Sequence, residues 1–173
     1  MNKVQKAGGG ILTQDGIHRA FANKQRRSNL IYNYEDEGEQ IVILNGKFTN
    51  GYGIESIITS AGDILQVSNK ARTLVEVTVR PLYAGGVANV IKIFKKAKGS
   101  VLASELLTTL KEFDYIYPYH QSLGFYMERA GYSNDDLSVI KSIGANVDFY
   151  LDYELEEDKE FNEDWRVFHP ARV

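Results

Sequence analysis

The side chains of this sequence that could do chemistry are three histidines, a few scattered carboxylates and two basic runs. His18, His120 and His169 stand far apart, and neither HExxH nor a similar zinc-binding spacing occurs. Cysteine is absent, and so are GxSxG, Walker A and GxGxxG. We therefore predict no metal site, no cofactor and no catalytic residue, and we expect His120 to be a hydrogen-bonded packing residue.

One stretch has a weak nuclease-like pattern. A carboxylate at Asp36 or Glu39 precedes a predicted strand that ends in Asn-Gly-Lys at residues 45–47. A metal-dependent nuclease needs a carboxylate in place of this asparagine, because a neutral amide does not supply the anionic oxygen that holds Mg²⁺. The pattern therefore predicts a degenerate nuclease-like domain at most.

Two basic runs could bind the phosphates of a nucleic acid. Their candidate residues are Lys24, Arg26, Arg27, Lys92, Lys95 and Lys96. Both runs are also typical of solvated helix faces, and the formal net charge of −3 argues against a surface built for nucleic acid or for an anionic membrane. A nucleic-acid-binding module is therefore an alternative hypothesis.

The elements that must position these side chains are organised around the segment 114–131. Tyr119, Leu123 and Tyr126 recur at helical spacing, Pro118 suits the start of a helix, and Gly131 suits its end. Buried tyrosines need partners for their hydroxyl groups, so we expect this helix to be a structural hub.

Periodicity predicts further helices on both sides of this one. A short helix begins after Thr13, and the ambiguous segment Ala71–Pro81 favours a helix because Arg72, Glu76 and Arg80 fall four residues apart. Four helices then follow in sequence, counting the hub. Gly85-Gly86 opens the first, Ser100 caps the second, and a Ser133 to Asp136 capping box starts the last, with Leu137, Ile140 and Ile143 inward.

Alternation and turn residues predict the strands. Leu30–Tyr34, Gln40–Leu44, Ile54–Ile58 and Ile64–Val67 form a small antiparallel sheet, with Asn45-Gly46 and Gly62-Asp63 as hairpin turns. Val147–Glu154 and Trp165–Phe168 are predicted to pair as a closing hairpin across an acidic loop.

These elements predict an α+β fold with a small antiparallel sheet, a run of about four helices and a C-terminal β-hairpin. The 173 residues suffice to bury a core without disulfides. Three consecutive glycines make residues 1–12 linker-like, and residues 13–173 are predicted to be a single domain. No apolar run approaches the roughly 18 residues of a membrane helix, and we expect a cytoplasmic protein.

Four segments carry a family resemblance. In chain order they are ARTLVEVTVRPLYAGGV, DYIYPYHQSLGFYMERAGY, VDFYLDY and WRVFHP. With them the sequence resembles the C-terminal region of AbiEi-type antitoxins, regulators of bacterial type IV toxin–antitoxin systems. The upstream segment GGGILTQDGIHRAFANKQRRSN, followed by ILNGK, is similar to the part that follows the N-terminal winged helix-turn-helix of such proteins. The resemblance therefore covers nearly the whole chain.

The resemblance implies a non-enzymatic antitoxin-like domain that counteracts a nucleotidyltransferase toxin. Its partner would be that toxin or the toxin's target, while DNA contact would belong to the winged-helix domain that precedes this region in the family. The sequence begins at about that boundary. The partner-contact candidates on the matching segments are Arg72, Arg80, Tyr83, Tyr119, His120, Gln121 and Arg129.

Overall fold

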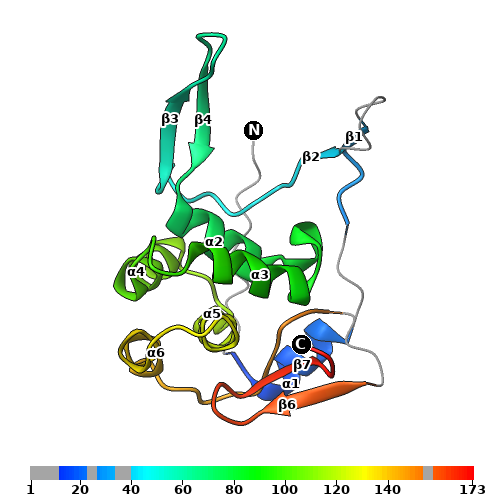
Figure 1. The fold of residues 1–173 in the computed structure, drawn as a ribbon. Coiled ribbons are helices and arrows are strands. Elements are labelled where there is room, and N and C mark those ends of the chain that lie inside the picture. Colours follow the sequence, from blue (N-terminus) through cyan, green and yellow to red (C-terminus); the bar gives the residue numbers. More distant parts are fainter. Residues whose placement is uncertain (1–11, 23–26, 34–39, 154–157) are drawn as a thin grey trace.

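The computed structural model of this chain describes residues 12–22, 27–33, 40–153 and 158–173, and Figure 1 shows their arrangement. The predicted α+β class is confirmed. The elements, in order, are α1 (Gln14–Phe21), β1 (Ile31–Asn33), β2 (Gln40–Val42), β3 (Ile54–Ile58), β4 (Ile64–Ser68), α2 (Lys70–Val79), the 3-10 turn η1 (Pro81–Ala84), α3 (Val87–Ala97), α4 (Ala103–Phe113), α5 (Tyr119–Arg129), α6 (Asn134–Lys141), β5 (Phe149–Tyr150), β6 (Lys159–Asn162) and β7 (Val167–Pro170).

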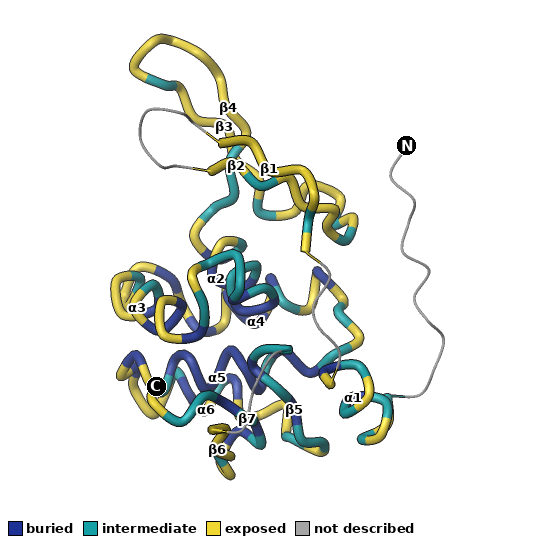
Figure 2. Tube along the Cα trace, turned by 90° about the vertical axis from the view of Figure 1, so that its right-hand side faces the viewer, coloured by how far each residue is buried: buried dark blue, intermediate teal, exposed yellow. Residues whose placement is uncertain are grey.

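α5 lies at the centre of the helical core, as the hub prediction required. Leu123, Phe125, Tyr126 and Met127 are fully buried, although their positions go all the way round the helix. Helices α2, α3, α4 and α6 all contact α5, and Figure 2 shows it as a buried element. Each such side chain contributes about 1.5–3 kcal/mol through the burial of apolar area. α5 therefore holds the helical layers together.

α2 confirms the helix favoured for Ala71–Pro81. Although valine and threonine are common in it, the Asn69 side chain caps its first turn by accepting a hydrogen bond from the Arg72 backbone N–H at 2.8 Å. The helix ends at Val79, because a proline at position 81 disfavours helical backbone in the residue before it. Gly85 and Gly86, at φ of 80° and 85°, then turn the chain into α3.

Two helix-end predictions were wrong. Ser100 does not cap α4, since its hydroxyl donates back to the Ala97 carbonyl at 2.7 Å and Leu102 takes the N-cap position. The Ser133 capping box of α6 is confirmed, but Ile143 is 39% exposed. Because α6 ends at Lys141, Ile143 lies beyond the helix and does not share its buried face.

The C-terminal sheet has the strand order β5-β7-β6, which corrects the predicted hairpin. β5 pairs with β7 in the parallel direction. The antiparallel partner of β7 is β6, and not the strand predicted at residues 147–154. β6, with the sequence KEFN, was missed because it lies within an acidic stretch that resembles a loop. The turn from β6 to β7 holds Arg166 at φ 51°, and the Asn162 side chain accepts a hydrogen bond from the Trp165 backbone N–H.

The C-terminal sheet joins the helical core through Trp165. The indole is 2% exposed and lies so close to Gly124 of α5 that a Cβ there would be 2.1 Å from its Cζ3. Beside it, the Gln121 side-chain amide donates to the carbonyls of Val147 and Trp165, at 2.9 Å and 2.8 Å. Glycine is therefore required at position 124 for the sheet to approach the helix.

α1 packs against this C-terminal sheet, as Figure 1 shows, with the predicted Thr13 cap in place. The Gln14 amide donates to the Asp148 carbonyl at 3.0 Å and accepts from the Asp148 N–H at 2.7 Å. Phe21 stacks on Tyr153 with ring centroids 4.3 Å apart. These contacts join two segments far apart in the sequence.

Residues 28–33 and 40–68, which we call the arm, project from the helical core (Figures 1 and 2). The predicted single sheet is in fact two separate two-stranded ladders, β1 with β2 and β3 with β4. The Gly62 turn between β3 and β4 is confirmed, with φ 90°. The Asn45-Gly46 hairpin was wrong: neither residue has a positive φ, and β2 pairs back onto β1 instead.

Candidate binding groove

A groove of about 850 Å³ lies between the arm and the helical core. Residues 42–54 form one side, and α2, η1 and part of α3 form the other, with Tyr115. Three of the predicted partner-contact residues, Arg72, Arg80 and Tyr83, line it together. The charged residues of the described lining are Lys47, Arg72, Glu76 and Arg80.

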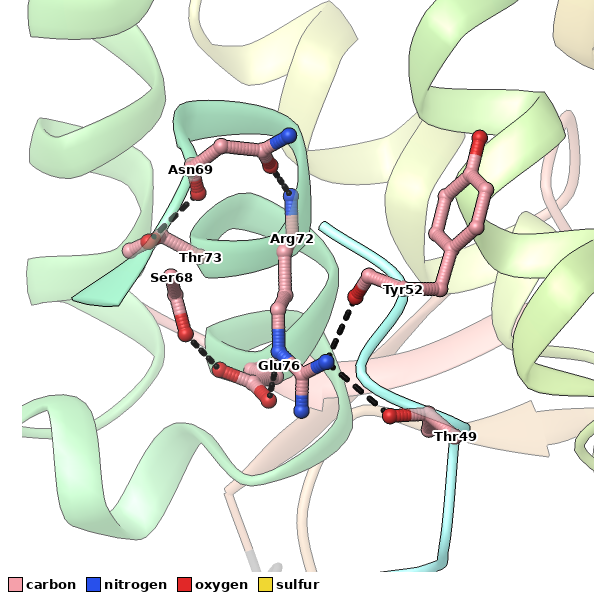
Figure 3. Close-up of polar contacts among 7 residues, drawn as sticks. All are labelled: Thr49, Tyr52, Ser68, Asn69, Arg72, Thr73 and Glu76. Atoms are coloured by element: carbon pink, nitrogen blue, oxygen red, sulfur yellow. Dashed lines mark hydrogen bonds and ion pairs between the residues drawn. The ribbon is translucent and has the colours of Figure 1, made fainter. Parts of the chain in front are cut away.

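Arg72 attaches the arm to α2 (Figure 3). Its Nε donates to Glu76 Oε1 at 2.9 Å, one turn along the helix, and its Nη1 donates to Thr49 Oγ1 at 2.9 Å and to the Tyr52 carbonyl at 2.5 Å. The guanidinium also lies 5.1 Å from the centroid of the Phe113 ring. Arg72 is therefore a structural link, with its side chain only 13% exposed.

Arg80 and Tyr83 make further contacts to the arm. Arg80 Nη2 donates to the Asn45 carbonyl at 3.1 Å, and the Tyr83 hydroxyl accepts from the Ser28 N–H at 2.8 Å. The three sequence candidates in the groove thus share one role, because each fixes a different point of the arm against α2 and η1.

Lys47, the residue that the nuclease-like pattern emphasised, is engaged structurally. Its Nζ donates to the Asp114 carbonyl and lies 3.5 Å from the Asp114 carboxylate. Asp114 is in the left-handed conformation, with φ 46°, just after α4. Asp36 and Glu39, the carboxylates of that pattern, lie outside the described residues.

The tyrosines beside the groove are shifted toward the neutral form. Burial raises the pKa of Tyr115, and the Glu76 carboxylate adds to the rise, while Arg80 and Arg72 oppose it. Tyr119 is buried behind it, edge-on to Tyr115 and to Phe149 with ring centroids 5.3 Å away in both cases. Burial chiefly raises the pKa of Tyr119 as well. Tyr119 is therefore a core residue, not a surface contact.

His120 and Gln121 also serve the fold. His120 Nε2 is 2.8 Å from the Gly144 carbonyl, which agrees with the packing role predicted for it. Burial lowers the pKa of His120, and the hydrogen bond to Gly144 opposes that shift. Gln121 is 1% exposed, and its amide bonds the backbone around Trp165.

The remaining sequence candidates lie away from the groove. Arg129 is exposed on α5, with its guanidinium 5.1 Å from the Phe125 ring. Lys92, Lys95 and Lys96 are exposed on α3. Arg27 is exposed, and Lys24 and Arg26 lie outside the described residues.

Sequence reasoning missed the apolar residues of the arm. Phe48 is 72% exposed at the groove, and Ile58 and Ile64 are 75% and 70% exposed beside the hairpin turn. The sequence pattern predicted the strands, and only the structure shows that all of β3 and the first three residues of β4 are exposed. Tyr115 was also missed as a groove residue, because it lies in a non-helical segment without periodicity.

Comparisons with known proteins add no relative. No family model matches this chain, and neither the curated proteins nor the solved structures contain a match. Among the described residues, no group of three or more histidine, aspartate or glutamate side chains is placed to hold a metal ion. In the same part of the chain, no helix is long and apolar enough to cross a membrane.

Proposed function

We propose that this chain is a non-enzymatic regulatory domain of the antitoxin type, which counteracts a nucleotidyltransferase toxin by binding a partner protein through the arm. The class follows from the resemblance of four segments to AbiEi-type antitoxins, and the binding surface follows from the exposure of the arm. The partner is the toxin itself or a protein on which the toxin acts.

The observation that carries the proposal is the concentration of exposed apolar side chains on the arm. Of seventeen large hydrophobic residues exposed in the described chain, thirteen lie between Leu30 and Leu65. Every residue of β3 is exposed. Monomeric proteins rarely expose large contiguous apolar patches, and an isolated two-stranded hairpin is marginally stable in water. A partner that covers the arm removes both costs.

The free strand edges of the arm suit such a partner. β3 and β4 pair only with each other in the described chain, so each leaves one row of backbone N–H and C=O groups unpaired. An extended segment can add to such an edge through main-chain hydrogen bonds while its side chains pack on the flanking residues. β4, with the sequence ILQVS, carries no charge that would oppose this addition.

The polar side chains of the groove also support a binding role over a catalytic one. Arg72 bonds Glu76, and Lys47 bonds Asp114. Outside the groove, His120, which could act as an acid or base, bonds a backbone carbonyl. Each of these side chains already has a structural contact.

Co-expression tests the proposal. The full chain is expressed together with the nucleotidyltransferase encoded beside its gene, and growth is measured. We expect the wild-type chain to restore growth and a variant with Ile58→Ser and Ile64→Ser to lose that effect. Leu102→Ser is the control outside the arm, since Leu102 is 70% exposed at the N-cap position of α4. Circular dichroism checks that both variants stay folded.

Two results would count against the proposal. If the wild-type chain does not restore growth, or no nucleotidyltransferase is encoded nearby, the antitoxin assignment is wrong. If the Ile58 and Ile64 variant restores growth as well as Leu102→Ser does, the arm is not the binding surface.

One observation favours nucleic-acid binding as a second function. Lys92, Lys95 and Lys96 lie on α3 at helical spacing, are exposed, and have no ion-pair partner in the described chain. Binding through phosphates would weaken steeply with salt. Measuring affinity for a duplex at two salt concentrations, with Lys95→Gln and Lys96→Gln, tests this function. Unchanged affinity in both variants would exclude the α3 face.

A further inference from the structure

Among the described charged residues of the groove, Arg80 is the one with no described carboxylate beside it. Lys47 lies 3.5 Å from the Asp114 carboxylate, and Arg72 lies 2.9 Å from that of Glu76. Arg80 donates to the Asn45 carbonyl, and in the described chain no carboxylate lies within 4 Å of it. The residue is only partly exposed. A guanidinium that lines a groove with no carboxylate beside it is free to donate charge-assisted hydrogen bonds to an anion there.

Tyr115 supplies a second donor in the same groove. Its ring lines the groove, and its hydroxyl has no hydrogen-bond partner among the residues that the structure describes. Burial and the Glu76 carboxylate raise the pKa of Tyr115, and Arg80 opposes them, so the guanidinium acts on this hydroxyl electrostatically. A carboxylate can accept from both an N–H of Arg80 and the O–H of Tyr115.

The rest of the groove is suited to an apolar body. Val42 and Leu44 of the arm face Val77 and Ile93 of the helical core across it. The volume of about 850 Å³ lies within the range of about 300–1,000 Å³ found for small-molecule pockets. These pockets are mostly apolar, with a few polar groups that fix the orientation of the ligand.

We propose that this groove binds a small apolar carboxylic acid, with its carboxylate on Arg80 and Tyr115 and its body between the arm and the helical core. The groove is bounded by the arm on one side and by α2, η1 and α3 on the other, and its volume of about 850 Å³ suits a small molecule. The lining excludes Ile58 and Ile64, the arm residues tested for partner binding, and the site does not rest on the antitoxin assignment.

Calorimetric titration of the full chain tests the site with a matched pair of probes. 1-Naphthoate carries the carboxylate, and 1-naphthamide has nearly the same shape without the charge. We expect the acid to bind roughly tenfold more tightly than the amide, since hydrogen bonds to charged groups contribute more than neutral ones. Arg80→Gln should remove this preference, and Tyr115→Phe should reduce it.

Two controls separate the site from general effects. Lys95→Gln makes the same change in charge on α3, outside the groove, and should keep the preference. Arg80→Lys keeps the charge and should keep most of the preference, even if the contact to Asn45 is weakened. Equal affinity for acid and amide in the wild-type chain would overturn the proposal, as would a preference that survives Arg80→Gln. Binding of an acidic peptide without binding of naphthoate would also overturn it.

Discussion

Gly124→Ala is the substitution whose effect the structure specifies most sharply. The added Cβ would meet three ring atoms of Trp165 at 2.1, 2.3 and 2.4 Å, whereas ordinary contacts begin near 3.4 Å. The indole must therefore move by more than 1 Å or leave its site. Moving it costs about 1–3 kcal/mol by overpacking, and expelling it costs about 4–6 kcal/mol of lost apolar burial. Alanine returns about 1 kcal/mol through its better helix propensity.

We therefore expect Gly124→Ala to lower the free energy of unfolding by up to about 2 kcal/mol if the indole shifts in place and by about 3–5 kcal/mol if it is expelled, equivalent to falls in Tm of up to roughly 8 °C and roughly 6–20 °C for a chain of this length. Urea denaturation followed by circular dichroism measures this change. Trp165 is the single tryptophan of the sequence, so its fluorescence reports on the displaced ring directly. A shift of the emission to longer wavelength would accompany the loss of stability if the indole reaches water.

Introducing Gly124→Ala into a Trp165→Leu variant tests whether the clash with the indole causes the loss of stability. With the indole removed, Gly124→Ala should become neutral or stabilising by up to about 1 kcal/mol, because only the helix-propensity gain remains. The reasoning is refuted if Gly124→Ala is harmless in the wild-type chain, or if it costs the same in both backgrounds.

Two further effects should follow from single side chains. Arg72→Ala removes the hydrogen bonds to Thr49 and to the Tyr52 carbonyl, so we expect the free energy of unfolding to fall by about 1–3 kcal/mol. Backbone hydrogen exchange in residues 49–54 should become faster, and unchanged exchange there would contradict this role of Arg72. Burial raises the pKa of Tyr126 in the folded chain, so above about pH 10 only the unfolded chain loses this proton. Stability should therefore fall as pH rises beyond 10, and Tyr126→Phe should reduce that fall in urea titrations; an equal fall in both proteins would contradict the assignment.

The helices could be predicted from the sequence because their signals are local. The capping box at Ser133, the cap at Thr13 and the period of α5 depend on residues within a few positions of one another, and the structure contains all three. The i,i+4 pair of Arg72 and Glu76 correctly favoured a helix in a segment rich in valine.

The sheets were less predictable because strand pairing depends on distant residues. Nothing local distinguishes β2 pairing back onto β1 from β2 pairing forward across Asn45. The parallel pairing of β5 with β7 likewise requires β6 to lie on the other edge of β7, and an acidic stretch gave no sign of this strand.

Part of the groove was predictable and part was not. Arg72, Arg80 and Tyr83 were predicted from the sequence as partner-contact candidates, and the structure brings them together at one site. Their partners could not be predicted, since the contacts of Arg80 and Tyr83 are to the backbone of Asn45 and Ser28, and any residue supplies such groups. Tyr119 and Gln121 are buried because they belong to α5, the central helix of the core.

The pairing of Gln14 with the Asp148 backbone sets an order for folding. Helices α2 to α6 are contiguous in sequence, so they can assemble through short loop closures. α1 must instead wait until β5 exists, because its contacts span 134 positions of the chain. During synthesis on the ribosome, α1 is therefore made well before its partner, and among the described helices it is one of the last to dock. Its hydrophobic face, with Ile17 and Phe21, stays exposed to chaperones and proteases until the C-terminal sheet closes.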